Sequence, residues 1–176
     1  FDYLEKRKGL VDAVCVTGGE PTLQSDLKDF LRKVRDMGYL TKLDTNGLRP
    51  DVLKDVLKEK LVDYVAMDVK NSLQKYAVTV GLESVDTSKI KESIDTLLSS
   101  DVEYEFRTTL IKEFHTAEDI EKIADTINGA QKYFMQKYKD NEECISHGFS
   151  PIEKDKAEKF KTFFDGKVAK IGLRGY

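Results

Sequence analysis

A loop with two consecutive glycines is the first stretch of this sequence whose residue types suggest chemistry. The apolar run Ala13–Val16 leads directly into Thr17–Pro21, which reads TGGEP. Because Gly18 and Gly19 carry no side chain, a ligand atom or another backbone can approach the main chain closely there. Glu20 adds a carboxylate beside that gap. Taken alone, the loop predicts equally well a tight strand-to-helix turn or a backbone site for a small polar ligand.

Polar residues also follow the next four apolar runs of the chain. They are Asp44-Thr45-Asn46-Gly47, then Asp68 and Lys70, then Arg107 and Thr109, and last Gln136. The first set is equally consistent with an ordinary turn in which Asn46 and Gly47 take positive φ. Lys70 is equally consistent with a solvated strand end. Arg107 lies within an apolar run, so its charge needs a partner.

The combined chemistry of these groups indicates one kind of ligand. An ammonium group binds carbonyls and carboxylates, a carboxylate binds lysine or arginine, and ribose hydroxyls bind aspartate or asparagine. A lone phosphate would be better served by glycine amides and cations, without so many acids. The set therefore predicts an amino acid joined to a nucleoside, provided that the residues meet at one place.

The pattern of apolar residues predicts the elements that would bring them together. Strand-like runs alternate with helical ones along the whole chain. The expected strands are Asp12–Thr17, Leu40–Asp44, Leu61–Val69, Tyr104–Ile111, Ala130–Gln136 and Val168–Leu173. Such alternation predicts a parallel α/β sheet, in which ligands bind at the carboxyl ends of the strands. Six strands are too few for a closed eight-stranded barrel, so a partial barrel and a doubly wound sheet both remain possible.

Several local signals mark where the helices should begin. Pro50 is expected in the first turn of a helix. Thr116–Asp119 and Ser150–Glu153 both read as capping boxes. The segment Phe1–Lys8 is expected to be helical and to precede the first strand, so that a strand ahead of it would be missing.

Composition limits the class of protein. The chain has 176 residues, with 40% hydrophobic and 35% charged residues and a net charge of -3, which suits one globular domain. Lysine and arginine are scattered rather than gathered in a basic stripe, so no nucleic-acid partner is expected. No apolar run approaches the roughly 20 residues of a membrane-spanning helix, so no membrane partner is expected either.

The two cysteines, Cys15 and Cys144, are too far apart in sequence for a disulfide framework or a metal-ligand motif. Cys15 is expected to be a buried core thiol and Cys144 an incidental thiol in a polar loop. Reduced cysteines without a secretory leader favour a cytoplasmic location. His115 and His147 are both expected in loops without a catalytic role.

The order of these motifs resembles that of radical S-adenosylmethionine (SAM) enzymes. Gly18–Pro21 looks like the GGEP motif of that family, and Leu43–Gly47 followed by Met67–Lys70 resembles the activating enzymes of glycyl-radical proteins. The similarity is greatest to the anaerobic ribonucleoside-triphosphate reductase activating proteins. The stretches that carry this narrower similarity are Val62–Asp68, Tyr104–Thr109 and Leu173–Gly175.

The resemblance implies a partial (β/α)6 TIM-like barrel that binds SAM and a [4Fe–4S] cluster. The methionine ammonium would contact the glycine loop and Glu20. Asp68 and Lys70 would contact the ribose and carboxylate region, and Asp44 with Thr45 would form a second polar cluster that also holds a monovalent cation in relatives. The residues that correspond to cofactor-binding positions are Gly18, Gly19, Glu20, Pro21, Asp44, Thr45, Asn46, Asp68, Lys70, Arg107 and Gln136.

One departure from the family pattern concerns the cluster. The family's Cys-x3-Cys-x2-Cys motif is absent, and neither Cys15 nor Cys144 can replace three neighbouring thiolates. We therefore expect residues 1–176 to be a single truncated domain that lacks the first strand and the cluster loop. Such a fragment is expected to be inactive alone and to bind SAM weakly. The unpaired side of the strand Asp12–Thr17 is expected to pair with a neighbouring copy.

For the intact protein, the resemblance implies a radical mechanism with no general base. A reduced cluster would donate one electron to SAM, and the resulting 5′-deoxyadenosyl radical would abstract a hydrogen atom from a glycine of anaerobic ribonucleotide reductase. An electron donor such as flavodoxin or ferredoxin is implied. Alternatives are an activase of a pyruvate formate-lyase-like protein, another radical SAM enzyme that modifies a peptide, and a non-catalytic barrel domain.

Overall fold

The computed structural model describes residues 1–142, 144 and 146–176, and its centre is one parallel sheet. The strands follow one another in chain order across the sheet, and every neighbouring pair is parallel. They are β1 (Ala13–Val16), β2 (Leu40–Thr45), β3 (Tyr64–Asp68), β4 (Glu103–Leu110), β5 (Ala130–Lys137) and β6 (Val168–Arg174). The predicted alternation of strands and helices is confirmed.

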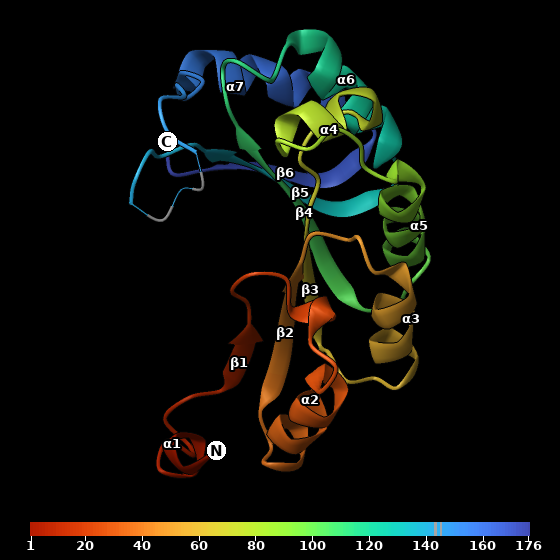
Figure 1. Cartoon of the computed structure of the whole chain (residues 1–176), viewed down its shortest axis with the longest axis vertical. Helices are drawn as coiled ribbons and strands as arrows, with labels where there is room; N and C mark the ends of the chain where they lie inside the picture. The colour runs from red at the N-terminus through yellow and green to blue at the C-terminus, as the bar shows by residue number, and fades with distance from the viewer. Residues whose placement is uncertain (143, 145) are drawn as a thin grey trace.

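Helices cover one face of the curved sheet and leave the other face open (Figure 1). The α-helices are α1 (Asp2–Glu5), α2 (Leu27–Asp36), α3 (Pro50–Lys58), α4 (Tyr76–Thr79), α5 (Thr87–Leu98), α6 (Ala117–Thr126) and α7 (Lys154–Lys161). Short 3-10 turns occupy Pro21–Leu23, Leu73–Lys75 and Thr162–Phe164. One-sided coverage decides between the two predicted architectures: the sheet is a partial barrel, because a doubly wound sheet has helices on both faces.

The hydrophobic core fills the layer between sheet and helices. Successive side chains of a strand point to opposite faces, and β4 shows the consequence clearly. Phe106 and Leu110 are fully buried in the core, whereas Arg107 lies on the other face of the same strand. The charged side chain of Arg107 therefore lies on the open face of the sheet, opposite the core.

The helix-start signals are confirmed in part. Pro50 is in the first turn of α3, and Thr116 and Asp119 form the reciprocal capping box before α6. The second predicted box is wrong: α7 begins after Glu153, and the Ser150 N–H instead binds the Glu113 carboxylate at 3.0 Å. The helix expected over Phe1–Lys8 is shorter, and spans only the four residues of α1.

The prediction that Cys15 is a buried core thiol is wrong. Its side chain is exposed, because β1 lies at the edge of the sheet and Cys15 points to the open face. Partial burial of the thiol by the surrounding chain and then the negative charge of Asp44 raise its pKa, so the thiol is protonated at neutral pH. No helix in the described part of the chain is long and apolar enough to cross a membrane.

The outer edge of β1 carries unpaired backbone groups in the described structure. The Leu40 N–H donates to the Asp12 carbonyl, and this bond sets the register of the parallel ladder. In that register the backbone hydrogen-bonding groups of Asp12, Val14 and Val16 point toward β2. The N–H groups of Ala13 and Cys15 therefore point away from the sheet. An exposed edge of this kind is a template for a strand of another molecule.

We expect the chain to self-associate through this edge, and Ala13→Pro to suppress the association. Proline removes an outward N–H and favours extended backbone before it, so the β1–β2 ladder should survive. Sedimentation velocity over a wide range of concentrations measures the association. The matched variant Ala13→Val keeps the N–H and should associate like the unmodified chain. A clean monomer at all concentrations would contradict the expectation.

Candidate functional site

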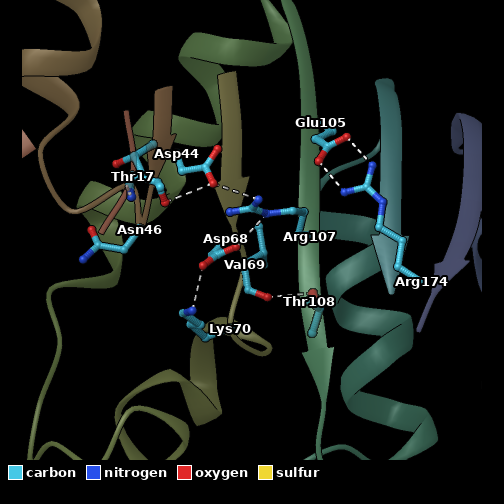
Figure 2. Close-up of polar contacts among 12 residues, drawn as sticks. Thr17, Asp44, Asn46, Asp68, Val69, Lys70, Glu105, Arg107, Thr108 and Arg174 are labelled. Atoms are coloured by element: carbon cyan, nitrogen blue, oxygen red, sulfur yellow. Dashed lines mark hydrogen bonds and ion pairs between the residues drawn. The ribbon is translucent and has the colours of Figure 1, made fainter. Parts of the chain in front are cut away.

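The carboxyl ends of β2 and β3 and the middle of β4 bring three predicted site residues into direct contact (Figure 2). Arg107 donates from Nε to Asp68 Oδ1 at 3.0 Å and from Nη1 to Asp44 Oδ2 at 3.2 Å. The register explains the contact, since Asp68 is the partner of Arg107 and Asp44 the partner of Ala66. The predicted convergence of these residues at one mouth of the sheet is confirmed, and so is the need of Arg107 for a partner.

Asp44 is the most heavily bonded carboxylate of this group. Its Oδ1 lies 2.7 Å from the Lys42 ammonium, and its Oδ2 accepts from the Thr17 hydroxyl at 3.3 Å as well as from Arg107. Burial works to raise the pKa of Asp44, but the Lys42 hydrogen bond and the Arg107 charge outweigh it, so the pKa is lowered. Asp44 is therefore an anion at neutral pH.

Arg107, Asp68 and Lys70 continue the row of charged side chains to the end of β3. We name the row Lys42, Asp44, Arg107, Asp68 and Lys70 the charge chain. The Arg107 side chain is only 14% exposed. Burial works to lower its pKa, but the charges of Asp68 and then Asp44 raise it, so the guanidinium stays charged. Asp68 Oδ2 also accepts from the Lys70 ammonium at 2.8 Å. The result is an alternating sequence of cation and anion from Lys42 to Lys70 across the open face.

The Glu20 carboxylate binds groups of the protein itself at the end of β2. Its Oε1 accepts from the hydroxyls of Thr22 at 2.6 Å and Thr45 at 2.8 Å, and its Oε2 accepts from the Asn46 N–H at 2.6 Å. The carboxylate therefore ties the glycine loop to the end of β2. Pro21 follows as the first residue of the 3-10 turn that Glu20 caps. Direct contact between Glu20 and a ligand stays a prediction.

The glycines of the loop leave open space beside the backbone. Gly18 has φ +123°, and a Cβ placed on either Gly18 or Gly19 would meet no atom within 4 Å. Gly47 differs, because a Cβ there would lie 2.1 Å from Met67 Cε, and its φ is +77°. Gly47 is thus required for packing, while the other two glycines keep a surface free for a ligand.

A small cavity lies against the outer side of the glycine loop. It has a volume of about 280 Å³ and is lined by Gly19, Pro21, Leu27 and Phe30 among others. Leu27 and Phe30 belong to α2, so the cavity lies between the glycine loop and that helix.

Gln136 lies on the same open face but outside the charge chain. It pairs with Thr109 across β4 and β5, and its amide makes no side-chain contact within the described residues. The structure therefore brings Gln136 to the same mouth without joining it to Asp44 or Asp68. Its role toward a ligand stays a prediction.

Four further polar residues of the open face were not singled out by the sequence. One is Lys42 beside Asp44, and the others form a closed group around the buried Glu105. Arg174 makes two hydrogen bonds to Glu105 at 2.6 and 2.7 Å, and Tyr64 donates a third at 2.8 Å. A charged residue two positions before a predicted site residue on the same strand could have indicated Lys42 and Glu105, which precede Asp44 and Arg107 in this way. No such signal marks Tyr64 or Arg174.

The residues present suit an amino-acid-plus-nucleoside ligand better than a metal. The open backbone at Gly18 and Gly19 suits an ammonium, the carboxylates suit hydroxyls, and Lys70 suits a carboxylate. Within the described residues, no group of three or more histidine, cysteine or acidic side chains could hold a metal ion. The described residues therefore do not supply the ligands of an iron–sulfur cluster.

Comparisons with known proteins place these observations in a family. A family model described as the Radical SAM superfamily matches residues 1–127. MJ1227 of Methanocaldococcus jannaschii, whose name proposes a glycyl-radical enzyme activating enzyme, is 34% identical over 163 residues, which cover 90% of this chain and 67% of that protein. MJ1632 of the same organism, similarly named, is 32% identical over 118 residues, covering 65% of this chain and 44% of that protein.

A solved structure has the same fold. A domain of pyruvate-formate lyase-activating enzyme from Bacteroides vulgatus has a TM-score of 0.72 at 17% sequence identity, covering 93% of this chain and 99% of that one. The chain thus spans about two thirds of one curated relative and less than half of the other.

We expect Arg107→Met to lower the free energy of unfolding by about 2 kcal/mol at pH 7, because Asp44 and Asp68 lose their shared cation. The folded-state pKa of Asp44 is lowered, so its stabilising contribution is present above the unfolded pKa and is lost as pH falls through the folded pKa. The difference between the two proteins should therefore shrink at acid pH. Urea unfolding at neutral and acid pH measures it.

Arg49→Met is the matched control, since Arg49 pairs with the exposed Asp51. We expect the free energy of unfolding of that variant to change by less than about 1 kcal/mol. Two results would contradict the role of Arg107 as the cation shared by Asp44 and Asp68. One is an equal loss of unfolding free energy in both variants, and the other is a loss in Arg107→Met that does not vary with pH.

Proposed function

Because this chain belongs to the radical SAM superfamily, we propose that its open sheet face is the SAM-binding face of a glycyl-radical activating enzyme. The observation that carries the proposal is the meeting of the glycine loop, Asp44, Asp68 and Lys70 at one mouth. These residues lie at or just beyond the ends of three neighbouring parallel strands, β1, β2 and β3, whose carboxyl ends lie along one edge of the sheet. Two relatives named for glycyl-radical activation support the narrower class.

Members of this family use SAM and a [4Fe–4S] cluster. When bound, SAM supplies the radical chemistry that removes a hydrogen atom from a substrate carbon. The residues of this chain fit SAM, as argued above, but those that the structure describes do not fit the cluster. The contribution of this chain is therefore to bind and orient the cofactor, and no electron-transfer step is assigned to its residues.

Each part of the mouth suits one part of the cofactor. The uncovered backbone at Gly18 and Gly19 would receive the methionine ammonium. Asp68 would accept from ribose hydroxyls, and the Lys70 ammonium would bind the methionine carboxylate. Arg107 holds Asp68 in place through a 3.0 Å hydrogen bond, so it would act mainly by positioning.

The other predicted site residues surround the proposed cofactor contacts. Thr45 and Asn46 bind Glu20 and so fix the glycine loop, and Pro21 starts the turn that follows it. Gln136 has a free amide on the open face and would bind the nucleoside end. A site fixed in advance by such contacts loses little free energy in ordering its groups when the ligand arrives.

We propose anaerobic ribonucleotide reductase as the radical acceptor, a flavodoxin or ferredoxin as the electron donor, and the cytoplasm as the location. The support is the resemblance of Val62–Asp68, Tyr104–Thr109 and Leu173–Gly175 to the activating proteins of that reductase. A pyruvate formate-lyase-like acceptor is compatible with the same site chemistry. The acceptor is therefore the part of the proposal that needs a direct experiment.

We expect Lys70→Met to weaken the binding of SAM about tenfold, because one charge-assisted contact to the methionine carboxylate is lost. Isothermal titration of the chain with SAM measures the dissociation constant. Lys89→Met removes an exposed lysine of α5 and serves as the control. Equal affinities for the unmodified chain and Lys70→Met would exclude the proposed role of Lys70.

The activity test uses the full-length natural protein, reconstituted with iron and sulfide without oxygen. We expect a glycyl radical signal by electron paramagnetic resonance when the reductase, SAM and a reductant are added. A glycyl radical signal on a pyruvate formate-lyase and none on the reductase would show that the lyase, not the reductase, is the radical acceptor. Absence of SAM cleavage in an iron-loaded preparation would overturn the enzyme proposal.

A further inference from the structure

The segment that follows β3 carries Lys70, and its backbone is held by side chains of other elements. The Val69 N–H still bonds to the Arg107 carbonyl of β4 at 2.8 Å, and the Thr108 hydroxyl donates to the Val69 carbonyl at 2.6 Å (Figure 2). One residue later, the N–H and the carbonyl of Lys70 both bind side chains instead. The position of the Lys70 ammonium therefore depends on the residues that make these two contacts.

Tyr76 binds the N–H of Lys70. Its hydroxyl accepts from that N–H at 3.3 Å and donates to the Asp68 carbonyl at 3.3 Å. The side chain is 2% exposed and belongs to the hydrophobic core, at the first position of α4. Tyr76 thus ties the end of β3 to the residue that carries the ammonium.

His115 binds the carbonyl of Lys70. It lies in the loop between β4 and α6, as expected from the sequence, and is 1% exposed. Its Nε2 is 2.9 Å from the Lys70 carbonyl, and because a carbonyl only accepts, Nε2 must carry the proton. Burial lowers the pKa of His115, so the ring is neutral at pH 7. Nδ1 of the neutral ring then accepts from the Ile111 N–H at 3.0 Å.

Further buried bonds join the Lys70 segment to the His115 loop. The Asn71 amide donates to the Phe114 carbonyl at 3.0 Å. The Ser72 hydroxyl donates at 3.3 Å to Asp119, which is 2% exposed and closes the capping box of α6. Because buried polar groups are costly to leave without partners, these bonds restrict how far the backbone of residues 69–72 can move.

We propose that His115 and Tyr76 are positioning residues, which hold the Lys70 backbone so that its ammonium meets the methionine carboxylate of bound SAM. The inference rests on the proposed function, because it concerns the ligand contact assigned there to Lys70. Neither side chain touches the cofactor in this arrangement, so neither is a catalytic residue.

The ammonium of Lys70 has donors left for such a contact. It has three N–H donors, and the 2.8 Å bond to Asp68 uses one of them. A lysine side chain loses rotamer freedom when it binds a ligand. A backbone that is fixed in advance keeps that cost to the side chain alone.

The test measures the affinity of the purified chain for SAM by isothermal titration. We expect His115→Phe, which keeps a ring but loses both hydrogen bonds, to weaken SAM binding about fivefold. The loss should not exceed that of Lys70→Met, because His115 acts only through Lys70. His115→Gln should bind SAM within about twofold of the unmodified chain, since the glutamine amide supplies a donor near the former Nε2.

Two further measurements separate positioning from a general loss of structure. Decarboxylated SAM keeps the nucleoside, sulfonium and ammonium and lacks only the carboxylate. Its affinity should be the same for His115→Phe and the unmodified chain. In a double-mutant cycle, His115→Phe added to Lys70→Met should cause no further loss of SAM affinity.

Tyr76→Phe provides a second variant if His115→Phe does not fold, since it removes one hydroxyl and keeps the buried ring. We expect it to weaken the binding of SAM, but not of decarboxylated SAM, about threefold. His147→Phe is the matched control, because His147 is the other histidine of the chain and bonds the exposed Asp140. That variant should leave both affinities unchanged.

Three results would overturn the inference. They are unchanged SAM affinity in both His115→Phe and Tyr76→Phe, equal weakening of SAM and decarboxylated SAM, and additive losses in the double-mutant cycle. If Lys70→Met weakens SAM binding while the other two variants do not, the proposed function stands and only the positioning roles are lost. Unchanged SAM affinity in Lys70→Met would overturn the proposed contact of Lys70 and the inference together.

Discussion

One arginine holds together the polar half of this molecule. Arg107 binds Asp44 and Asp68, which come from different strands, while its own strand contributes Phe106 to the core on the other face. A largely buried guanidinium between two carboxylates is stable only if both stay ionised and in place. The alternating charges therefore fix the carboxyl ends of β2 and β3 against the middle of β4, and the proposed ligand contacts depend on those positions.

Glu20 extends the same constraint to the glycine loop. Its two oxygens accept from groups at the end of β2, so the loop is attached to the strand that also carries Asp44. An acidic side chain next to two glycines suggests a direct ligand contact. Here, however, the carboxylate accepts hydrogen bonds from Thr22, Thr45 and Asn46. The position of the open backbone thus depends on Glu20, whether or not the carboxylate itself touches a ligand.

The sequence predicted the six strands, the parallel sheet and the meeting of Asp44, Asp68 and Arg107, because polar residues that follow parallel strands lie along one edge of the sheet. The order of the strands came from the structure, since a doubly wound sheet was equally consistent with the alternation of strands and helices. The sequence did not predict the exposure of Cys15, since an apolar run looks the same at an edge as in the centre of a sheet. The capping box predicted at Ser150–Glu153 was wrong for a similar reason. The residue types suit a helix cap, but the Ser150 N–H binds Glu113, which is distant in sequence. The Glu105–Arg174 pair joins strands that are not neighbours, and no local pattern encodes such a contact.

The distribution of charge over the open face explains how one face can hold a selective site. Three cations, Lys42, Arg107 and Lys70, surround the two carboxylates Asp44 and Asp68, and the Glu20 carboxylate at the end of β2 balances the third positive charge. Farther along the sheet, Glu105 is neutralised by Arg174, whose guanidinium also lies 3.7 Å above the Phe134 ring. That part of the face has no charge free to attract a ligand. Recognition of a ligand that carries both signs must then come from the placement of single groups at the mouth, and those are the groups that Arg107 and Glu20 hold in position.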